Sequence, residues 1–362
     1  MSNRRAPAAQ PAIVRAEDLA AAGLIAPEAV AAAAAVGRRY AIRVTPAMAG
    51  LMDATAAGGD AMRRQFLPDP AELDPAPEEC ADPIGDDAHS PVPGLVHRYP
   101  DRVLLKPISV CPVYCRFCFR RETVGAAAAM TPAEIDTALD YVAGRPEIWE
   151  VILTGGDPLM LKPASLARIV GRIEAIGHVA VLRLHTRVPV AEPARVTGEL
   201  AAALRGTGRL AVYVSVHSNH PAEIGDEARA AAARLADAGL PLLAQTVLLR
   251  GVNDDVETLS SLMRALVAAR IRPYYLHHPD LAPGTTRFRL DIAEGQRLVA
   301  ALRGRLSGLC QPTYVLDVPG GYGKAPVGPV YAAADGDRWR VRDPFGREHE
   351  YPPAVAGLRP GC

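Results

Sequence analysis

Several features that would assign a chain to a class at once are missing from this sequence. Its 362 residues carry no formal net charge, because Lys+Arg and Asp+Glu number 40 each. Binding along a nucleic-acid backbone needs a clear basic excess, so we expect no nucleic-acid partner. No apolar run reaches the roughly 18 residues of a membrane span, so we expect no membrane partner. The basic, proline-containing start Met1–Gln10 has no apolar signal core behind it and is predicted to be a loose tail.

Cysteine is scarce, and its distribution is uneven. Three of the six cysteines are clustered at Cys111, Cys115 and Cys118. Such clustering suits a reducing, cytoplasmic compartment better than a disulfide framework. The isolated Cys80, Cys310 and Cys362 suggest no role.

The remaining composition is that of an ordinary soluble protein. Hydrophobic residues make up 49% and charged residues 22%. The length allows one large α/β barrel or two modest domains.

The first part of the chain, residues 1–95, is predicted to be a helical extension followed by a linker. We expect helices at Ala16–Gly23, Ala26–Val36 and Pro46–Leu67. The stretch Pro68–Pro93 is rich in Pro, Asp and Glu and lacks periodicity, so we expect a long surface connection.

The second part, residues 96–308, repeats a strand–helix unit six times. Six alternating units predict a parallel sheet, here a partial (β/α)6 TIM-like barrel. In such barrels the chemistry gathers at the C-terminal ends of the strands. Strands are expected at Val103–Ile108, Glu150–Thr154, Ala180–His185, Leu210–Val216, Pro241–Leu249 and Arg272–His278. Helices are expected at Pro132–Val142, Pro163–Ile176, Pro193–Leu204, Ala222–Ala238, Val256–Ala269 and Ile292–Leu306.

The third part, residues 309–362, is predicted to be a small β appendage. Short strands are expected at Thr313–Leu316, Val327–Ala332 and Arg338–Val341. The fold class is therefore α/β, a barrel with a helical extension before it and this appendage after it.

The cysteine loop, which we define as Cys111–Gly125, directly follows the first predicted barrel strand. Its cysteines are separated by three and then two residues, so their sulfurs can converge on one centre. Three thiolates leave one iron of a [4Fe–4S] cluster open, and S-adenosylmethionine is the usual ligand there. The alternative is a structural zinc site, but no Cys or His follows within a dozen residues to complete it. The motif resembles that of the radical S-adenosylmethionine superfamily.

Two glycine-containing segments lie at predicted strand ends. Leu153–Pro158 includes Gly155, Gly156 and Asp157, which suit an amino-acid moiety or else form a plain turn. Placed one unit after the cysteine loop, this segment resembles the stretch that holds the methionine amino group of S-adenosylmethionine. The segment Asp317–Val327 departs from a phosphate-binding P-loop, because Val318 and Ala325 replace its Gly and Ser/Thr. Its Lys324 is either a surface-turn residue or a Schiff-base lysine for an aldehyde cofactor.

Six segments together resemble the lysine 2,3-aminomutase family, in that family's order. The resemblance runs from about Val44 to Val330, and the Asp-x-Pro-Gly-Gly-x-Gly-Lys string is its most specific part. It implies an isomerase that uses a [4Fe–4S] cluster, S-adenosylmethionine and pyridoxal phosphate. The segments are His97–Val103, the cysteine loop, Leu153–Pro158, Gln245–Asn253, Pro273–Tyr275 and Asp317–Lys324.

The resemblance also implies roles for single residues. Cys111, Cys115 and Cys118 match the cluster ligands, and Lys324 matches the lysine that holds pyridoxal phosphate. Arg120 matches the arginine that pairs with the substrate α-carboxylate.

Two aspartates, Asp280 and Asp317, match those that hold the far ammonium of lysine, although ordinary loop carboxylates are the alternative. The remaining matches concern the cofactors. His217 is expected to contact S-adenosylmethionine. Further cofactor contacts are expected at Arg98, Tyr99, Arg102 and Gln245, although Arg98 and Arg102 could instead form a solvated basic turn.

The chain also departs from the longer family members. They end in a cysteine-rich zinc segment that helps build the oligomer, whereas this sequence stops at Pro360–Cys362 and has Asp255 where a zinc cysteine is expected. We therefore expect no structural zinc. The resemblance still allows a homo-oligomer, but these departures weaken the expectation of a tetramer. His277–Pro279 is more histidine-rich than usual, which leaves the substrate open. The short form resembles the branch that makes β-lysine for modification of elongation factor P.

Three functions thus remain open. The first is moving the α-amino group of L-lysine to C3, with a reducing electron donor such as flavodoxin or ferredoxin. The second is the same reaction on another amino acid such as glutamate, whose site should lack the two aspartates. The third is a non-catalytic domain that holds zinc or a cluster and serves as an interaction module.

Overall fold

The computed structural model describes residues 11–53, 55–125 and 129–352. The predicted tail Met1–Gln10 and Cys362 lie outside these residues. No helix within the described ranges is both long and apolar enough to cross a membrane.

The centre of the molecule is a nine-stranded sheet whose strands lie side by side in sequence order. Strands β2 to β8 run parallel, and the antiparallel β1 and β9 flank them. The end strands β1 and β9 are not paired with each other, so the barrel curves without closing completely. The predicted partial barrel is thereby confirmed. The strands are β1 Leu95–Tyr99, β2 Arg102–Ile108, β3 Glu150–Gly155, β4 Val181–Thr186, β5 Ala211–His217, β6 Leu242–Val247, β7 Ile271–His277, β8 Thr313–Val318 and β9 Gly323–Pro326.

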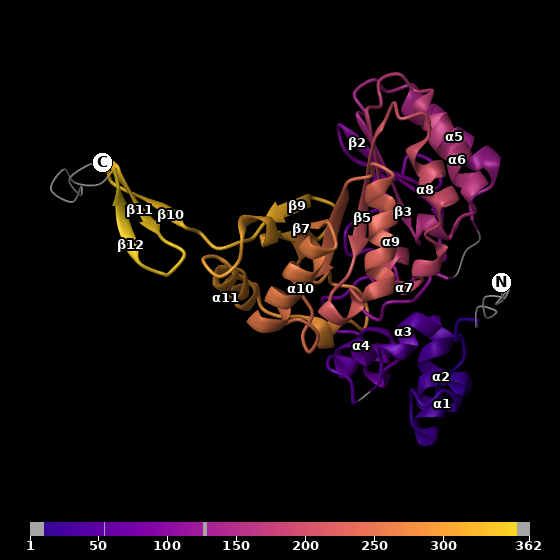
Figure 1. Cartoon of the computed structure of the whole chain (residues 1–362), viewed down its shortest axis with the longest axis horizontal. Coiled ribbons are helices and arrows are strands. Elements are labelled where there is room, and N and C mark those ends of the chain that lie inside the picture. Colours follow the sequence, from indigo (N-terminus) through magenta and orange to yellow (C-terminus); the bar gives the residue numbers. More distant parts are fainter. Residues whose placement is uncertain (1–10, 54, 126–128, 353–362) are drawn as a thin grey trace, which may run out of the picture.

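Helices cover the outside of the curved sheet (Figure 1). Each presents one apolar face to it; in α6 this face is Leu166, Ile169, Val170 and Ile173. The helices are α5 Pro132–Ala143, α6 Pro163–Glu174, α7 Val188–Ala191, α8 Gly198–Arg205, α9 Asp226–Asp237, α10 Val256–Ala268 and α11 Ile292–Leu302.

Two of the predicted barrel helices are interrupted. Pro193–Leu204 divides into a 3-10 turn, Pro193–Arg195, and α8, because Thr197 accepts the Leu200 N–H at 3.1 Å and starts a new helix. Ala222–Ala238 divides at Gly225 into the 3-10 turn Pro221–Glu223 and α9.

The N-terminal helices pack on the cysteine loop. Their buried apolar cluster includes Val113 of that loop. The predicted helix Pro46–Leu67 is wrong as a single element, because the helix ends at Gly50 and resumes only after Gly58, whose φ of +86° suits glycine. The helices are α1 Ala16–Ala21, α2 Val30–Arg39 after a 3-10 turn Pro27–Ala29, α3 Pro46–Gly50 and α4 Gly59–Phe66.

The stretch Pro68–Pro93 is exposed over most of its length, as its composition predicts, but a few of its residues are buried. It contains the 3-10 turns Pro70–Leu73 and Asp87–His89, and two of its carboxylates are buried, Glu72 at 0% and Asp86 at 6% exposure. These two carboxylates pair with buried arginines. The prediction of a surface connection is therefore wrong only for the part of the stretch that faces the interior.

The C-terminal segment divides into two parts. Strands β8 and β9 extend the main sheet, whereas β10 Ala332–Asp335, β11 Arg338–Arg342 and β12 Glu348–Tyr351 form a separate sheet that projects from the body (Figure 1). The predicted strand Val327–Ala332 is wrong, because residues 327–331 form an irregular connection between β9 and β10, in which Gly328 and Pro329 disfavour a strand.

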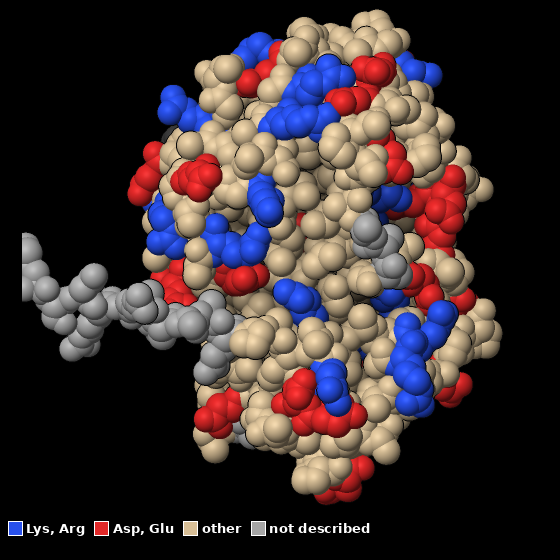
Figure 2. Space-filling model, turned by 90° about the vertical axis from the view of Figure 1, so that its right-hand side faces the viewer, with Lys and Arg blue, Asp and Glu red and all other residues tan. Residues whose placement is uncertain are grey.

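The surface shows no segregation of charge in the view of Figure 2. Basic and acidic side chains alternate over that face of the described chain. This agrees with the balanced composition of the whole sequence.

Candidate active site

The concave side of the sheet holds a cavity of about 590 Å³. Residues at the starts of β2, β3 and β4 line it, as do residues at and beyond the ends of several strands. Every candidate residue named from the sequence lies on its wall, which brings residues from the second and third parts of the chain to one place. They are Arg98, Tyr99, Arg102, Cys111, Cys115, Cys118, Arg120, Gly155, Gly156, Asp157, His217, Gln245, Asp280, Asp317 and Lys324.

The three clustered cysteines are unbridged thiols at this wall. Burial, together with the charges of Asp157 and the other two sulfurs, raises the pKa of Cys111 well above its ordinary value. Burial likewise raises the pKa of Cys118 to about 11. The thiols therefore keep their protons until a positive centre lies beside them. Among the described residues, no three His, Cys, Asp or Glu side chains are arranged to hold a single metal ion.

A buried arginine contacts the middle cysteine. Nη1 of Arg187, just beyond β4, donates to Sγ of Cys115 at 3.0 Å. Its Nη2 donates to Gln65 Oε1 at 2.9 Å and to Glu223 Oε2 at 2.7 Å. Burial raises the pKa of Cys115, and the charged donor at its sulfur counteracts part of that rise by favouring the thiolate.

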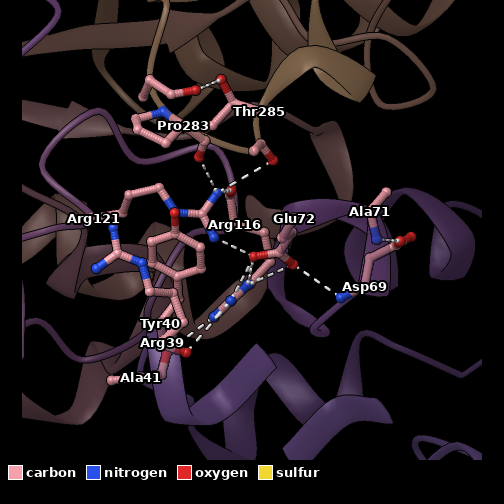
Figure 3. A network of polar contacts seen from close by, with 12 residues as sticks. Arg39, Tyr40, Ala41, Asp69, Ala71, Glu72, Arg116, Arg121, Pro283 and Thr285 are labelled. Atoms are coloured by element: carbon pink, nitrogen blue, oxygen red, sulfur yellow. Dashed lines mark hydrogen bonds and ion pairs between the residues drawn. The ribbon is translucent and has the colours of Figure 1, made fainter. Parts of the chain in front are cut away.

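The backbone of the cysteine loop is fixed by a buried ion network (Figure 3). Glu72 accepts from Arg116 Nη2 at 2.6 Å and also from Arg121 Nη2. Arg116 Nη1 continues to Ala41 O at 2.9 Å, and Arg121 Nη1 to Pro283 O at 3.1 Å. Both arginines flank the cysteines in sequence, so this network ties the loop to the N-terminal extension and to the segment after β7.

The glycines after β3 allow close packing of the chain on the cysteine loop. A Cβ on Gly156 would lie 2.5 Å from Ser109 C, and Gly155 adopts a φ of +101°. The Gly156 N–H donates to Ile108 O at 2.6 Å. The glycines therefore bring the end of β3 against the residues that lead into Cys111.

The carboxylate of Asp157 is occupied within the protein. It accepts from Thr186 Oγ1 at 2.7 Å and from the backbone N–H groups of Arg187 at 2.6 Å and Leu159 at 3.0 Å. Burial outweighs these bonds and raises the pKa of Asp157 to about 6. Asp157 thus joins the ends of β3 and β4 at the cavity wall.

Lys324 faces Asp317 across the β8–β9 hairpin. The two are direct partners in the antiparallel register, so their side chains lie on one face. Lys324 Nζ donates to both Asp317 oxygens, at 2.8 and 2.6 Å. The Lys324 backbone N–H donates to Tyr99 Oη at 2.7 Å, and this bond anchors the lysine to β1. The amine is therefore held at the cavity rather than in an external turn.

A second carboxylate and a histidine surround this ion pair. Burial and the charge of Asp317 raise the pKa of Asp280 to about 7. Burial and the positive charge of Lys324 lower the pKa of His277 to about 3, and its Nδ1 lies 3.8 Å from Asp317 Oδ2. At neutral pH the imidazole is uncharged, so this end of the cavity carries two carboxylates and one amine.

The guanidinium of Arg120 is paired with Asp86. Its Nε and Nη2 donate to Asp86 Oδ2 at 3.2 and 2.9 Å, and its Nη1 lies 3.4 Å from Thr154 Oγ1 at the end of β3. Asp86 Oδ1 accepts from Arg98 Nη2 at 2.9 Å. Arg98 and Arg120 are therefore connected through one buried carboxylate.

The remaining candidates form the sides of the cavity. Gln245 Nε2 lies 3.3 Å from His185 Nε2, and His217 Nε2 lies 3.2 Å from Asn219 Oδ1. Arg102 stacks on the Tyr99 ring at 3.7 Å and pairs with Asp101, near the starts of the strands. It is thus neither a fully solvated turn residue nor a neighbour of the cysteines.

Comparison with known proteins identifies the family. A family model described as the radical SAM superfamily matches residues 105–263. The L-lysine 2,3-aminomutase of Clostridium subterminale is 41% identical over 321 residues, which cover 88% of this chain and 76% of that one. The L-lysine 2,3-aminomutase of Acetoanaerobium sticklandii is 43% identical over 289 residues, with coverage of 80% and 69%. The chain belongs to the L-lysine 2,3-aminomutase family.

This finding confirms the resemblance seen in the motifs and the prediction of an isomerase. The family also contains a related specificity. The glutamate 2,3-aminomutase of Clostridioides difficile is 36% identical over 278 residues, which cover 76% of this chain and 65% of that one.

Family membership implies a [4Fe–4S] cluster, S-adenosylmethionine and pyridoxal phosphate as cofactors. The residues present fit the cluster, because three thiols share one wall and the guanidinium of Arg187, which donates to Cys115, offsets part of the burial that raises the pKa of that thiol. They also fit pyridoxal phosphate. Lys324 offers an amine at the cavity, and Arg98 has a buried Nε without a hydrogen-bond partner among the described residues.

Sequence reasoning missed three residues of this cavity system. Asp86 lies in the stretch that was predicted to be a surface connection. His185 and Arg187 lie at the end of β4, where the sequence contains no recognised motif. The string His185-Thr-Arg187 could have been found, because polar residues at the end of a buried parallel strand indicate a site. Nothing in the local sequence marks Asp86.

Proposed function

We propose that this member of the L-lysine 2,3-aminomutase family acts on L-lysine itself and moves its α-amino group to C3, giving β-lysine. The supporting observation is the pair Asp280 and Asp317, both on the wall of the cavity that also holds Arg120. A substrate with a carboxylate at one end, facing Arg120, and an ammonium at the other end, facing the two aspartates, matches this distribution of charge.

Charge complementarity favours lysine over glutamate. Glutamate would place its side-chain carboxylate near two aspartates, and like charges in a buried site repel one another strongly. An ammonium, by contrast, would lower the cost of keeping Asp280 ionised, whose pKa is raised to about 7 by burial and by Asp317. The lysine side chain therefore stabilises the site that the aspartates form.

The protein's own residues bind, orient and enclose the substrate. Arg120 receives the α-carboxylate, the aspartates receive the far ammonium, and Lys324 carries the aldehyde cofactor near both. When bound, the cluster and S-adenosylmethionine supply reversible hydrogen-atom abstraction, and pyridoxal phosphate supplies the conjugated carbonyl that carries the migrating nitrogen. The cavity wall of buried strands excludes water from the reacting atoms.

Asp317 is placed to serve both the cofactor lysine and the substrate. It pairs with Lys324, the residue that would hold pyridoxal phosphate, at 2.8 and 2.6 Å. The same carboxylate would pair with the far ammonium of lysine, so cofactor attachment and lysine recognition would share Asp317.

A panel of amino acids tests this proposal. The anaerobically reconstituted enzyme should turn over lysine far faster than norleucine, which has the same carbon chain without the ammonium. Glutamate should be poorer still, and ornithine intermediate. Turnover of norleucine or glutamate that equals turnover of lysine would refute the assignment.

Delivery of β-lysine to elongation factor P, the identity of the electron donor and the oligomeric state stay predictions of the sequence resemblance. Incubation of the enzyme with elongation factor P, its lysine-attaching enzyme and lysine, followed by intact mass measurement, would test the first of them.

A further inference from the structure

We propose that Asp86 is a positioning residue that orients Arg120 for the substrate carboxylate and links it to Arg98. Asp86 lies in the otherwise largely exposed stretch Pro68–Pro93, is 6% exposed, and belongs to none of the motifs that identify the family. It contacts the cations around it and is not itself part of the cavity lining.

The geometry around Asp86 fixes one edge of Arg120. Nε and Nη2 of Arg120 both donate to Asp86 Oδ2, at 3.2 and 2.9 Å. A guanidinium presents a second pair of donors at its other edge, Nη1 and Nη2. Nη1 lies 3.4 Å from Thr154 Oγ1, a residue of the cavity wall, so this second edge is turned toward the cavity. The bonds of Arg120 Nε and Nη2 to Asp86 therefore determine the direction in which the second edge of the guanidinium, Nη1 and Nη2, points.

Asp86 is also part of a chain of alternating charges that runs from Arg120 to Lys324. Arg120 pairs with Asp86, and Arg98 Nη2 lies 2.9 Å from Asp86 Oδ1. Arg98 Nη1 lies 3.9 Å from Asp317 Oδ1, and Asp317 pairs with Lys324. The carboxylate-binding arginine and the lysine are thus held by one set of ion pairs.

The backbone around Asp86 is itself firmly placed. Asp82 Oδ1 accepts the Asp86 N–H at 2.8 Å, and Ser90 Oγ donates to Asp86 O at 2.8 Å. The neighbouring Gly85 touches the segment Asp317–Lys324, which we call the lysine loop, because a Cβ on Gly85 would lie 2.7 Å from Gly321 N. A carboxylate held this rigidly can define the orientation of a long side chain.

Asp86 remains ionised in this position. Burial raises its pKa, but the charges of Arg120, Lys106 and Arg98 outweigh burial and hold the pKa below its ordinary value. Lys106 Nζ lies 3.8 Å from Asp86 Oδ2, so three cations share one carboxylate. The excess of positive charge leaves Arg120 able to attract a second anion.

A rival role predicts the opposite effect. If Asp86 were a competing anion that the substrate must displace, its removal would strengthen lysine binding. If it positions Arg120, its removal weakens binding of the α-carboxylate in particular. Asp86 can position a substrate in this way only if Arg120 receives the α-carboxylate, as the proposed function holds.

The experiment compares lysine with lysinamide, which lacks the carboxylate charge, in wild type, Asp86→Asn and Asp87→Asn. Asp87 is exposed on the same turn, so its variant controls for loss of one negative charge. We expect Asp86→Asn to raise the KM for lysine about 10- to 100-fold with a smaller change in kcat, since misorientation by about 1 Å has effects of this size. The preference for lysine over lysinamide should fall by a similar factor, whereas Asp87→Asn should match wild type.

Several results would overturn the role of Asp86. A lower KM for lysine would show competition, and equal losses on lysine and lysinamide would show a merely structural residue. If Asp86→Asn does not fold, Asp86→Glu keeps the charge, moves it by one methylene and should show the same loss of preference. If wild type rejects lysine, the proposed function fails, and the same comparison with the accepted amino acid and its amide still tests Asp86.

Discussion

The cysteine loop and the lysine loop reach one cavity from opposite ends of the sheet, but different forces hold them. The cysteine loop is fixed from behind by Arg116 and Arg121, which are 2% and 7% exposed and share Glu72. The lysine loop lies on an edge hairpin, and its Tyr322 is 83% exposed. Buried ion pairs thus hold the cysteine loop in place before any cofactor binds. The lysine loop, by contrast, stays accessible to a covalent cofactor.

The largest effect should come from removing either loop's own functional group. Cys115→Ala should abolish lysine turnover and most of the iron, normally about four per chain, because three thiolates are the minimum for the cluster. Pyridoxal phosphate should still be trapped on Lys324 by borohydride. Lys324→Ala should show the reverse, full iron without trapped cofactor. Loss of both groups in either variant would contradict the independence of the two loops.

Weakening the support of the cysteine loop should be costly for the whole protein. Glu72→Gln leaves two buried guanidinium groups without their carboxylate and should reduce the free energy of unfolding by about 3–5 kcal/mol. Urea denaturation of the cofactor-free protein measures this. Glu78→Gln is the matched control, because Glu78 pairs with Arg289 at a side-chain exposure of 52% and should change stability by less than about 1 kcal/mol.

The lysine side of the cavity should instead respond to pH. Burial and Asp317 raise the pKa of Asp280 to about 7, so Asp280 gains a proton as pH falls through 7 and loses its attraction for an ammonium. The kcat/KM for lysine should therefore fall below pH 7. Asp280→Asn should lower kcat/KM by roughly 30-fold or more above pH 7, where Asp280 is ionised in wild type, and should remove this pH dependence, so the two enzymes converge as pH falls. An unchanged pH profile in Asp280→Asn would assign the titration to another group.

The smallest expected effect concerns the anchor of the lysine loop. Tyr99→Phe removes the acceptor of the Lys324 backbone N–H and should reduce the free energy of unfolding by only about 0.5–1.5 kcal/mol. Thermal unfolding measures the change. A loss as large as that of Glu72→Gln would show that the two loops are held equally firmly.

Sequence patterns predicted the parts of the molecule whose signal is local. The strands β2 to β7 were found because apolar runs alternate with amphipathic helices, and the residues at the cavity followed from strand ends and motifs. Strand β1 was missed, because His97-Arg98-Tyr99 interrupts its apolar run and its pairing with β2 needs the folded register.

Long-range ion pairs could not be read from the sequence. Glu72 and Asp86 lie in a stretch whose composition predicts exposure to solvent. Their burial is possible because arginines that are distant in sequence pair with them and offset the free-energy cost of burying a charge. The same limit applies to the packing of Gly156 against the backbone before Cys111, which needs the folded register of β2 and β3. The ligand contact that the pattern of Leu153–Pro158 suggests stays a prediction.

The contact between Gly85 and Gly321 bears on the order in which the enzyme forms during synthesis. The hydrogen-bond partners of the cysteine loop, from Arg39 to Gly284, are all synthesised before the lysine loop. The contact of Gly85 with the lysine loop spans more than two hundred positions, and such distant closures come late in folding. We therefore expect nascent chains to acquire a docking place for iron first and an amino-acid pocket only near completion, so a stalled or truncated chain would carry a radical-generating centre without the pocket that confines it.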